Sequence, residues 1–101
     1  MSIPDYQSFM LPVLRLAADY KEHTEPEVAE KLAQQLQISD IDRQQRIKSG
    51  QPLLNNRIGW AITYLRQAKI LEKGTQRGTF KITSRGAQLL AQNPARITRF
   101  C

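Results

Sequence analysis

The periodicity of the apolar residues changes once along this chain, and that change constrains the fold more than any other feature of the sequence. Before residue 69, apolar side chains recur at spacings of three and four, as they do on one face of an α-helix. After it, two short β-prone runs, residues 70–73 and 79–83, flank a turn bounded by Gly74 and Gly78. Two such runs around a glycine-bounded turn predict a β-hairpin. The sequence therefore predicts helices first and a hairpin after them.

Two helices are predicted in the first third of the chain. Residues 6–17 carry an apolar stripe, but Pro12 removes an interior hydrogen bond, so we expect a kink or a late start. Thr24 and Glu27 have the spacing of a capping box, in which each side chain accepts a hydrogen bond from the backbone of the other residue. A second helix should therefore open at Thr24.

The middle of the chain contains one weak and one strong helical segment. Ser39 can cap a short helix that ends near residue 47. Residues 54–68 then repeat apolar side chains at helical spacing, and Asn55 or Asn56 is the expected N-cap of this third strong helix.

A closing helix, capped by Ser84, is predicted after the hairpin. The chain therefore fits one small domain of the α+β class, mainly α with a small β-hairpin. The order is that of a winged helix-turn-helix, in which the third helix enters the DNA major groove and the hairpin, or wing, lies along the backbone. We assign residues 1–92 to this domain and residues 93–101 to a C-terminal tail or the start of a linker.

Charge is divided unevenly along the chain. Three basic and eight acidic residues precede Arg43, whereas twelve basic residues and one acid, Glu72, follow from Arg43 onward. The segment with the third helix and the hairpin is therefore strongly basic within a chain of net charge +6. A basic segment of this kind favours double-stranded DNA as the partner, the alternative being a solvated surface whose halves attract each other.

The predicted third helix and wing carry side chains suited to DNA. In the major groove, arginine commonly donates hydrogen bonds to guanine, and asparagine and glutamine commonly bond to adenine. Trp60 either packs on DNA sugars or covers residues 37–51 as part of a small core, and we favour the structural role. For Tyr64, a DNA contact and a structural role are equally open. At the wing tip, Arg77 suits a narrow minor groove. The candidate DNA-binding residues are Asn55, Asn56, Arg57, Trp60, Thr63, Tyr64, Gln67, Lys73, Gln76, Arg77 and Lys81.

No catalytic, metal or cofactor site is predicted. Asp5, Asp19 and Lys21 match the residue types of a metal-dependent nuclease, but the two acids lie at opposite ends of one predicted helix. The single histidine, His23, is expected to be a turn residue, and the single cysteine, Cys101, excludes an internal disulfide. No apolar run is long enough for a membrane span and no secretion signal precedes the first helix, so we expect a cytoplasmic protein.

Several runs of residues resemble a known family. The most specific is Asn-Arg-Ile-Gly-Trp-Ala at 56–61, and matching segments stand at 3–7, 11–14, 64–65, 68–71, 77–80 and 82–86. From residue 3 to about residue 90, the chain resembles the N-terminal domain of Mrr-type restriction endonucleases. The resemblance implies a winged-helix, DNA-binding module of a restriction system, which delivers a separate C-terminal nuclease domain absent from this chain. Lys69 departs from the pattern because winged helices usually place glycine at this helix end, which implies a strained or differently closed C-terminus.

Two other function classes stay open at this point. Winged helices also serve as protein–protein or dimerisation modules, and the acidic second helix could dock a basic partner or the second subunit of a homodimer. A stand-alone transcription regulator would share every feature described so far. Binding that weakens steeply with salt, and that a DNA competitor abolishes, would favour DNA.

Overall fold

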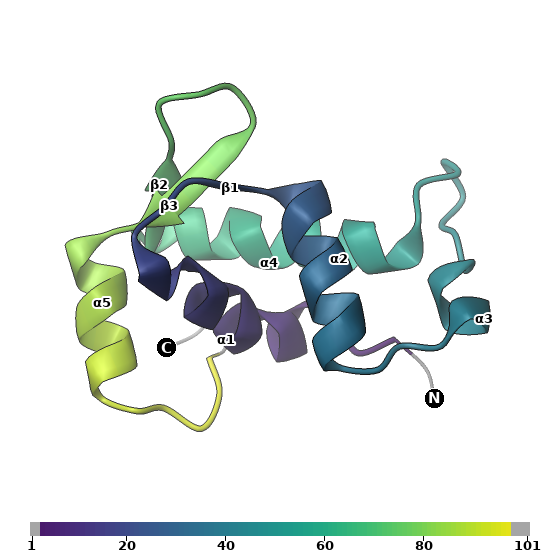
Figure 1. The fold of residues 1–101 in the computed structure, drawn as a ribbon, viewed down its shortest axis with the longest axis horizontal. Helices are drawn as coiled ribbons and strands as arrows, with labels where there is room; N and C mark the ends of the chain where they lie inside the picture. The colour runs from purple at the N-terminus through teal and green to yellow at the C-terminus, as the bar shows by residue number, and fades with distance from the viewer. Residues whose placement is uncertain (1–2, 98–101) are drawn as a thin grey trace.

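The computed structural model describes residues 3–97, and within them the main helices and the hairpin follow the predicted order (Figure 1). A C-terminal tail was predicted for residues 93–101, of which 98–101 lie outside the described range. The elements are α1 (Tyr6–Leu16), the 3-10 turn η1 (Ala17–Asp19), β1 (His23–Thr24), α2 (Glu25–Gln35), α3 (Asp40–Arg43), α4 (Leu53–Gln67), β2 (Leu71–Lys73), β3 (Thr79–Ile82) and α5 (Ser84–Ala91).

The first two helices start where side chains can cap them. Asp5 accepts a hydrogen bond from the Ser8 amide at 3.0 Å, so α1 begins at Tyr6 and continues through Pro12, and the expected late start is wrong. The capping box that opens α2 is confirmed, because the Glu27 amide donates to the Thr24 hydroxyl and the Thr24 amide donates to the Glu27 carboxylate.

The N-cap predicted for α4 is wrong. Pro52 occupies that position, and Asn55 and Asn56 both lie inside the helix. Leu54, in the first turn, is 2% exposed and belongs to the buried stripe of the helix. The N-cap of α5 is likewise Thr83, whose hydroxyl accepts from the Gly86 amide, and Ser84 is the first helical residue.

The segment before α4 forms less helix than predicted. Ser39 caps α3 as expected, accepting from the Asp42 amide at 3.1 Å, but the helix ends at Arg43 after one turn. The chain then forms an isolated antiparallel bridge between Arg46 and Pro52. This bridge leads the chain directly into α4.

α4 ends in a Schellman motif, the same closure that glycine makes in other helices. The Ile70 amide donates to the Leu65 carbonyl at 2.9 Å, and the Lys69 amide donates to the Arg66 carbonyl at 3.0 Å. Lys69 adopts the left-handed conformation, with φ 65°, which is strained for a residue with a side chain. Of the two expectations for this helix end, the strained C-terminus is therefore confirmed and the different closure is wrong.

The predicted hairpin is confirmed, and it belongs to a three-stranded antiparallel sheet of order β1-β3-β2. β1 was not predicted, because a strand of two residues is too short to show alternation. It pairs with β3 and places His23 opposite Phe80.

One apolar core joins α1, α2, α4 and the sheet. Phe9, Leu32, Ile58 and Leu65 are fully buried, and Ile82 brings β3 into the same cluster. Figure 1 shows α1 and α2 in front of α4, and the hairpin projecting beside them. The opposite side of α4 is therefore left open next to the wing. No helix of residues 3–97 is long and apolar enough to cross a membrane.

Candidate nucleic-acid interface

Four of the candidate residues share the outer face of α4. Asn56, Trp60, Thr63 and Gln67 follow one another at spacings of four, three and four, opposite the buried stripe that contains Ile58. The Trp60 side chain is 50% exposed and contacts Tyr64, with ring centroids 6.0 Å apart. The favoured interpretation of Trp60 as a core residue is therefore wrong, because half of its surface meets solvent.

Two other candidates lie on the flank of α4 that faces α1. The Arg57 guanidinium donates hydrogen bonds from Nη1 to the carbonyl oxygens of Ile3 at 2.7 Å and Pro4 at 2.9 Å. Tyr64 stacks on Tyr6 with ring centroids 4.9 Å apart. The candidate residue Arg57 therefore points away from the outer face, toward the N-terminal segment that supplies its acceptors. Asn55 is partly buried and is also displaced from the outer face.

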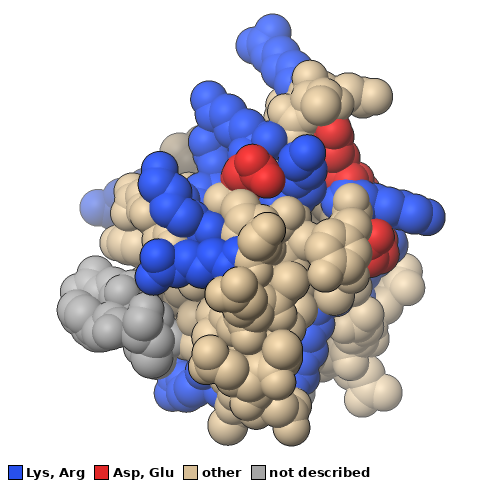
Figure 2. Space-filling view, turned by 90° about the vertical axis from the view of Figure 1, so that its left-hand side faces the viewer, with Lys and Arg blue, Asp and Glu red and all other residues tan. Residues whose placement is uncertain are grey.

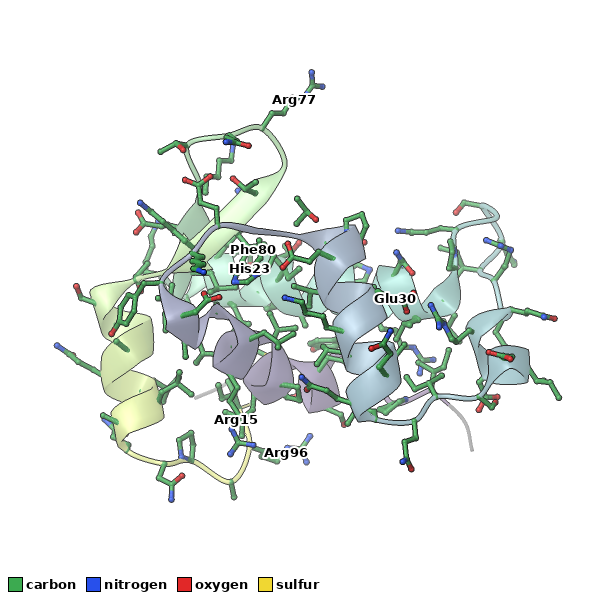
Figure 3. All side chains as sticks on the ribbon, viewed as in Figure 1. Arg15, His23, Glu30, Arg77, Phe80 and Arg96 are labelled. Carbon is green, nitrogen blue, oxygen red and sulfur yellow. The ribbon has the colours of Figure 1, made fainter. Side chains whose placement is uncertain are left out.

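The strand register separates the basic residues of the wing. Lys73 pairs with Phe80, on the face whose other residues are buried, whereas Lys81 pairs with Glu72 on the opposite face. Lys73 and Lys81 therefore lie on opposite faces of the same hairpin. Figure 3 shows Arg77 at the tip of the wing, pointing away from the body of the molecule.

One carboxylate, not predicted from the sequence, holds the wing loop. Glu22 accepts hydrogen bonds from the Thr75 amide at 2.9 Å, the Thr75 hydroxyl at 2.6 Å, the Gln76 amide at 3.2 Å and the Thr79 hydroxyl at 2.9 Å. The bond from the Thr75 hydroxyl is the largest cause that lowers the pKa of Glu22, to about 2. Partners more than fifty residues apart leave no local signal in the sequence.

The two glycines that bound the wing loop have different roles. Gly78 has φ 77°, as expected for a tight hairpin end. Gly74, in contrast, does not have positive φ. It is required by close packing instead, since a Cβ there would collide with the Thr79 hydroxyl and lie 2.7 Å from the Glu22 carboxyl carbon.

A groove of about 580 Å³ separates α4 from the wing. The cations of Arg66, Lys73 and Arg77 line it from both elements. Arg66 is absent from the sequence-based candidates, although it follows Thr63 by three residues and so adjoins the outer face of α4. Groove and outer face together form the candidate interface.

An acidic side chain stands between the groove and the outer face. The Glu25 carboxylate belongs to the first turn of α2 and would lie 3.1 Å from a Cβ built on Gly59 of α4. Burial raises the pKa of Glu25 above its ordinary value. Within residues 3–97 the Glu25 side chain has no hydrogen-bond or ion-pair partner.

Positive charge gathers around the wing. Figure 2 shows the side of the molecule that carries the hairpin and α5, with many Lys and Arg side chains and few acids. Lys and Arg side chains thus outnumber the acids on this side of the molecule. Such a surface attracts polyanions.

His23 is a buried residue of the sheet, and its assignment to a turn is wrong. Its Nδ1 lies 2.7 Å from a Glu27 carboxylate oxygen, and its Nε2 lies 2.9 Å from one of Asp19 (Figure 3). Burial lowers the pKa of His23, but the two carboxylates outweigh it, so the pKa is raised overall. Asp19 is thus engaged with His23, while Asp5 caps α1, and the two do not converge on a common site. No group of His, Cys, Asp and Glu among residues 3–97 could hold a metal ion.

The fold is mainly α with a small antiparallel sheet, and its open helix beside a basic hairpin is consistent with the winged helix-turn-helix class. Residues 6–92 match the family model of the Mrr N-terminal domain, and the chain belongs to this family. Over 99 residues it is 35% identical to the type IV methyl-directed restriction enzyme EcoKMrr of Escherichia coli strain K12. The matched region covers 97% of this chain and 32% of that protein. The chain thus spans about a third of the length of this relative. No solved structure matches the chain significantly.

Proposed function

We propose that this domain binds double-stranded DNA, with the outer face of α4 in the major groove and the wing on the backbone. The observation that carries the proposal is the position of the cation-lined groove directly beside an uncharged, hydrogen-bonding helix face. Cations bind phosphates of any sequence, whereas amides and hydroxyls distinguish base edges. The two kinds of side chain are adjacent here, as recognition of a duplex requires.

The proposal assigns different roles to the candidate residues. Asn56, Thr63 and Gln67 meet base edges, and Trp60 gives them an apolar neighbour. Lys73 and Arg77, together with Gln76 of the same loop, meet the backbone, as does Arg66. Arg57 and Tyr64 support α4 through their contacts with the N-terminal segment and α1. Asn55 and Lys81, which lie away from the interface, make no direct contact.

The domain acts, in this proposal, within a longer restriction enzyme. The chain matches about a third of a relative that is named a methyl-directed restriction enzyme. Cleavage is assigned to a nuclease domain outside the matched region. Because that relative is named methyl-directed, we propose that the DNA target includes a methylated base. The domain itself supplies recognition, without a catalytic group or a cofactor of its own.

Titration of labelled duplexes, measured by fluorescence anisotropy at several salt concentrations, tests the proposal. Matched duplexes with and without methylated adenine or cytosine should differ in affinity, and the logarithm of the affinity should fall linearly with the logarithm of the salt concentration. Binding that is insensitive to salt would contradict the proposal and favour a protein–protein module. Sedimentation of the free and DNA-bound domain would test whether it forms a homodimer.

A further inference from the structure

The outer face of α4 contains a shallow hollow next to the wing groove. Its volume is about 280 Å³, and Gly59 is one of the residues that line it. Asn56 and Trp60 border it from α4, and Glu25 borders it from α2. The Asn56 amide donates to the Gln51 side chain at 3.3 Å, which orients both amides at the rim. The hollow therefore combines a carboxylate, oriented amides and an exposed aromatic ring.

The Glu25 carboxylate differs from the acids around it. Glu22 is bonded to the wing loop, Glu27 to the cap of α2 and to His23, and Glu30 to Arg43 at 2.7 Å. Glu25 accepts no hydrogen bond from residues 3–97, although it is partly buried. Its position depends on Gly59, because a Cβ there would come within 3.1 Å of one carboxylate oxygen. The helix thus leaves room for a carboxylate that the fold itself does not use.

The Glu25 carboxylate should lower the affinity for DNA unless a hydrogen-bond donor of the DNA contacts it. Phosphates repel the charge, and a carboxylate that loses water without gaining a hydrogen bond is strongly disfavoured. In the major groove, cytosine N4 and adenine N6 are the donors, whereas guanine O6 and thymine O4 are acceptors that would repel a carboxylate. Among the base edges of the major groove, only the amino groups can therefore donate a hydrogen bond to the partly buried Glu25 carboxylate.

We propose that Glu25 is a specificity-determining residue, which accepts a hydrogen bond from the exocyclic amino group of a cytosine or adenine docked at the hollow over Gly59. The proposal rests on the proposed binding of DNA by α4 and adds the acceptor that selects the base. The outer face of α4 then reads the duplex together with α2, which the helix order alone would not indicate.

The experiment selects bound sequences from a pool of randomised duplexes with three proteins. Wild type should show one position at which cytosine or adenine is preferred. Glu25→Gln should lose that preference by about tenfold, because an amide can donate to the keto bases as well as accept. Glu30→Gln is the matched control: it removes the same charge from the same helix and should keep the preference. Thermal unfolding of each variant confirms that it is folded.

Base analogues then separate the two sources of the amino group. A duplex with 2-pyrimidinone in place of cytosine, or purine in place of adenine, lacks only that group. Wild type should lose about tenfold in affinity for one of these duplexes, and Glu25→Gln should lose less, because its neutral amide is a weaker acceptor than the carboxylate. The analogue that weakens binding identifies the base.

Two outcomes would overturn the inference. If Glu25→Gln and Glu30→Gln raise affinity for all duplexes by the same factor and preserve the preference, then Glu25 acts only as a repelling charge. If the analogues bind wild type and Glu25→Gln with the same loss, another residue reads the amino group. Failure of wild type to bind any duplex would instead contradict the proposed function itself, and the inference with it.

Discussion

α4 and the wing lie side by side at the candidate interface, but different forces hold them. α4 is fixed by apolar packing against α1 and α2, with Ile58 and Leu65 fully buried. The wing loop is fixed by the single carboxylate of Glu22 through four hydrogen bonds. Loss of one core side chain should therefore weaken the whole domain, whereas loss of Glu22 should release the loop alone. The helix and the wing are thus two parts of one interface that can be perturbed separately.

The largest effect is expected when the support of α4 is removed. Leu65→Ala should lower the free energy of unfolding by about 2 to 5 kcal/mol, because it leaves a cavity in the core. Denaturant unfolding followed by circular dichroism measures the change. Gln67→Ala, two residues away on the exposed face, should alter stability by less than about 0.5 kcal/mol. Equal losses in the two variants would show that α4 does not depend on apolar packing.

A smaller effect is expected at the flank of α4. Arg57→Ala should lower the free energy of unfolding by about 1 to 2 kcal/mol, since it leaves the Ile3 and Pro4 carbonyls without their donor. DNA affinity should fall by the same factor for every sequence, as expected for a supporting residue. Altered base preference in the selected sequences would instead place Arg57 in the groove.

The sheet beneath the wing should respond to pH through His23. Its pKa is raised in the folded domain above the ordinary value of 6.5, so its stabilising effect is complete below that value and is lost as pH rises through the folded pKa. The pKa values of Asp19 and Glu27 are lowered mainly by the hydrogen bonds to His23, so their contribution is lost as pH falls through the folded values. Melting temperatures of His23→Gln should lack the decline of wild type above pH 6.5.

The contrast between α4 and the wing also explains what the sequence could predict. Helical spacing places Leu54, Ile58 and Leu65 on one face, and this local pattern correctly predicted the helix α4 and its buried stripe. The capping box of α2 and the hairpin are local patterns too, and both are confirmed. Most of the fold followed from such patterns.

The errors concern contacts between distant residues. Arg57 turns toward carbonyls more than fifty positions away, which no helical wheel indicates. Glu22 and His23 lie in a short connection without periodicity, yet they hold the wing and the sheet. Lys73 and Lys81 were both predicted to bind DNA, but the register that places them on opposite faces is a property of the paired strands. Side-chain direction was the information that the sequence lacked.

A local effect is expected when the wing loses its anchor. Glu22→Gln replaces an ionised acceptor by a neutral amide, so the Thr75 and Gln76 amides should exchange hydrogen about tenfold faster or more. The amides of α4 should keep their protection. Because the pKa of Glu22 is about 2, below its ordinary value of 4.5, the anchor in wild type should persist until pH falls to about 2. Uniformly faster exchange across α4 would contradict the independence of the two regions.

The smallest effect distinguishes the two faces of the wing. Lys73 lines the groove beside α4, whereas Lys81 lies on the opposite face and pairs with Glu72. If the groove face meets the DNA backbone, Lys73→Ala should lower the slope of log affinity against log salt by about 0.9, the value for one phosphate contact. Lys81→Ala removes the same charge from the same hairpin and should leave the slope unchanged. Arg77→Ala, at the tip, should behave like Lys73→Ala if the tip also meets the backbone. If Lys81→Ala lowers the slope and Lys73→Ala leaves it unchanged, the wing contacts DNA through its far face. In that case only the α4 side of the groove would contact DNA.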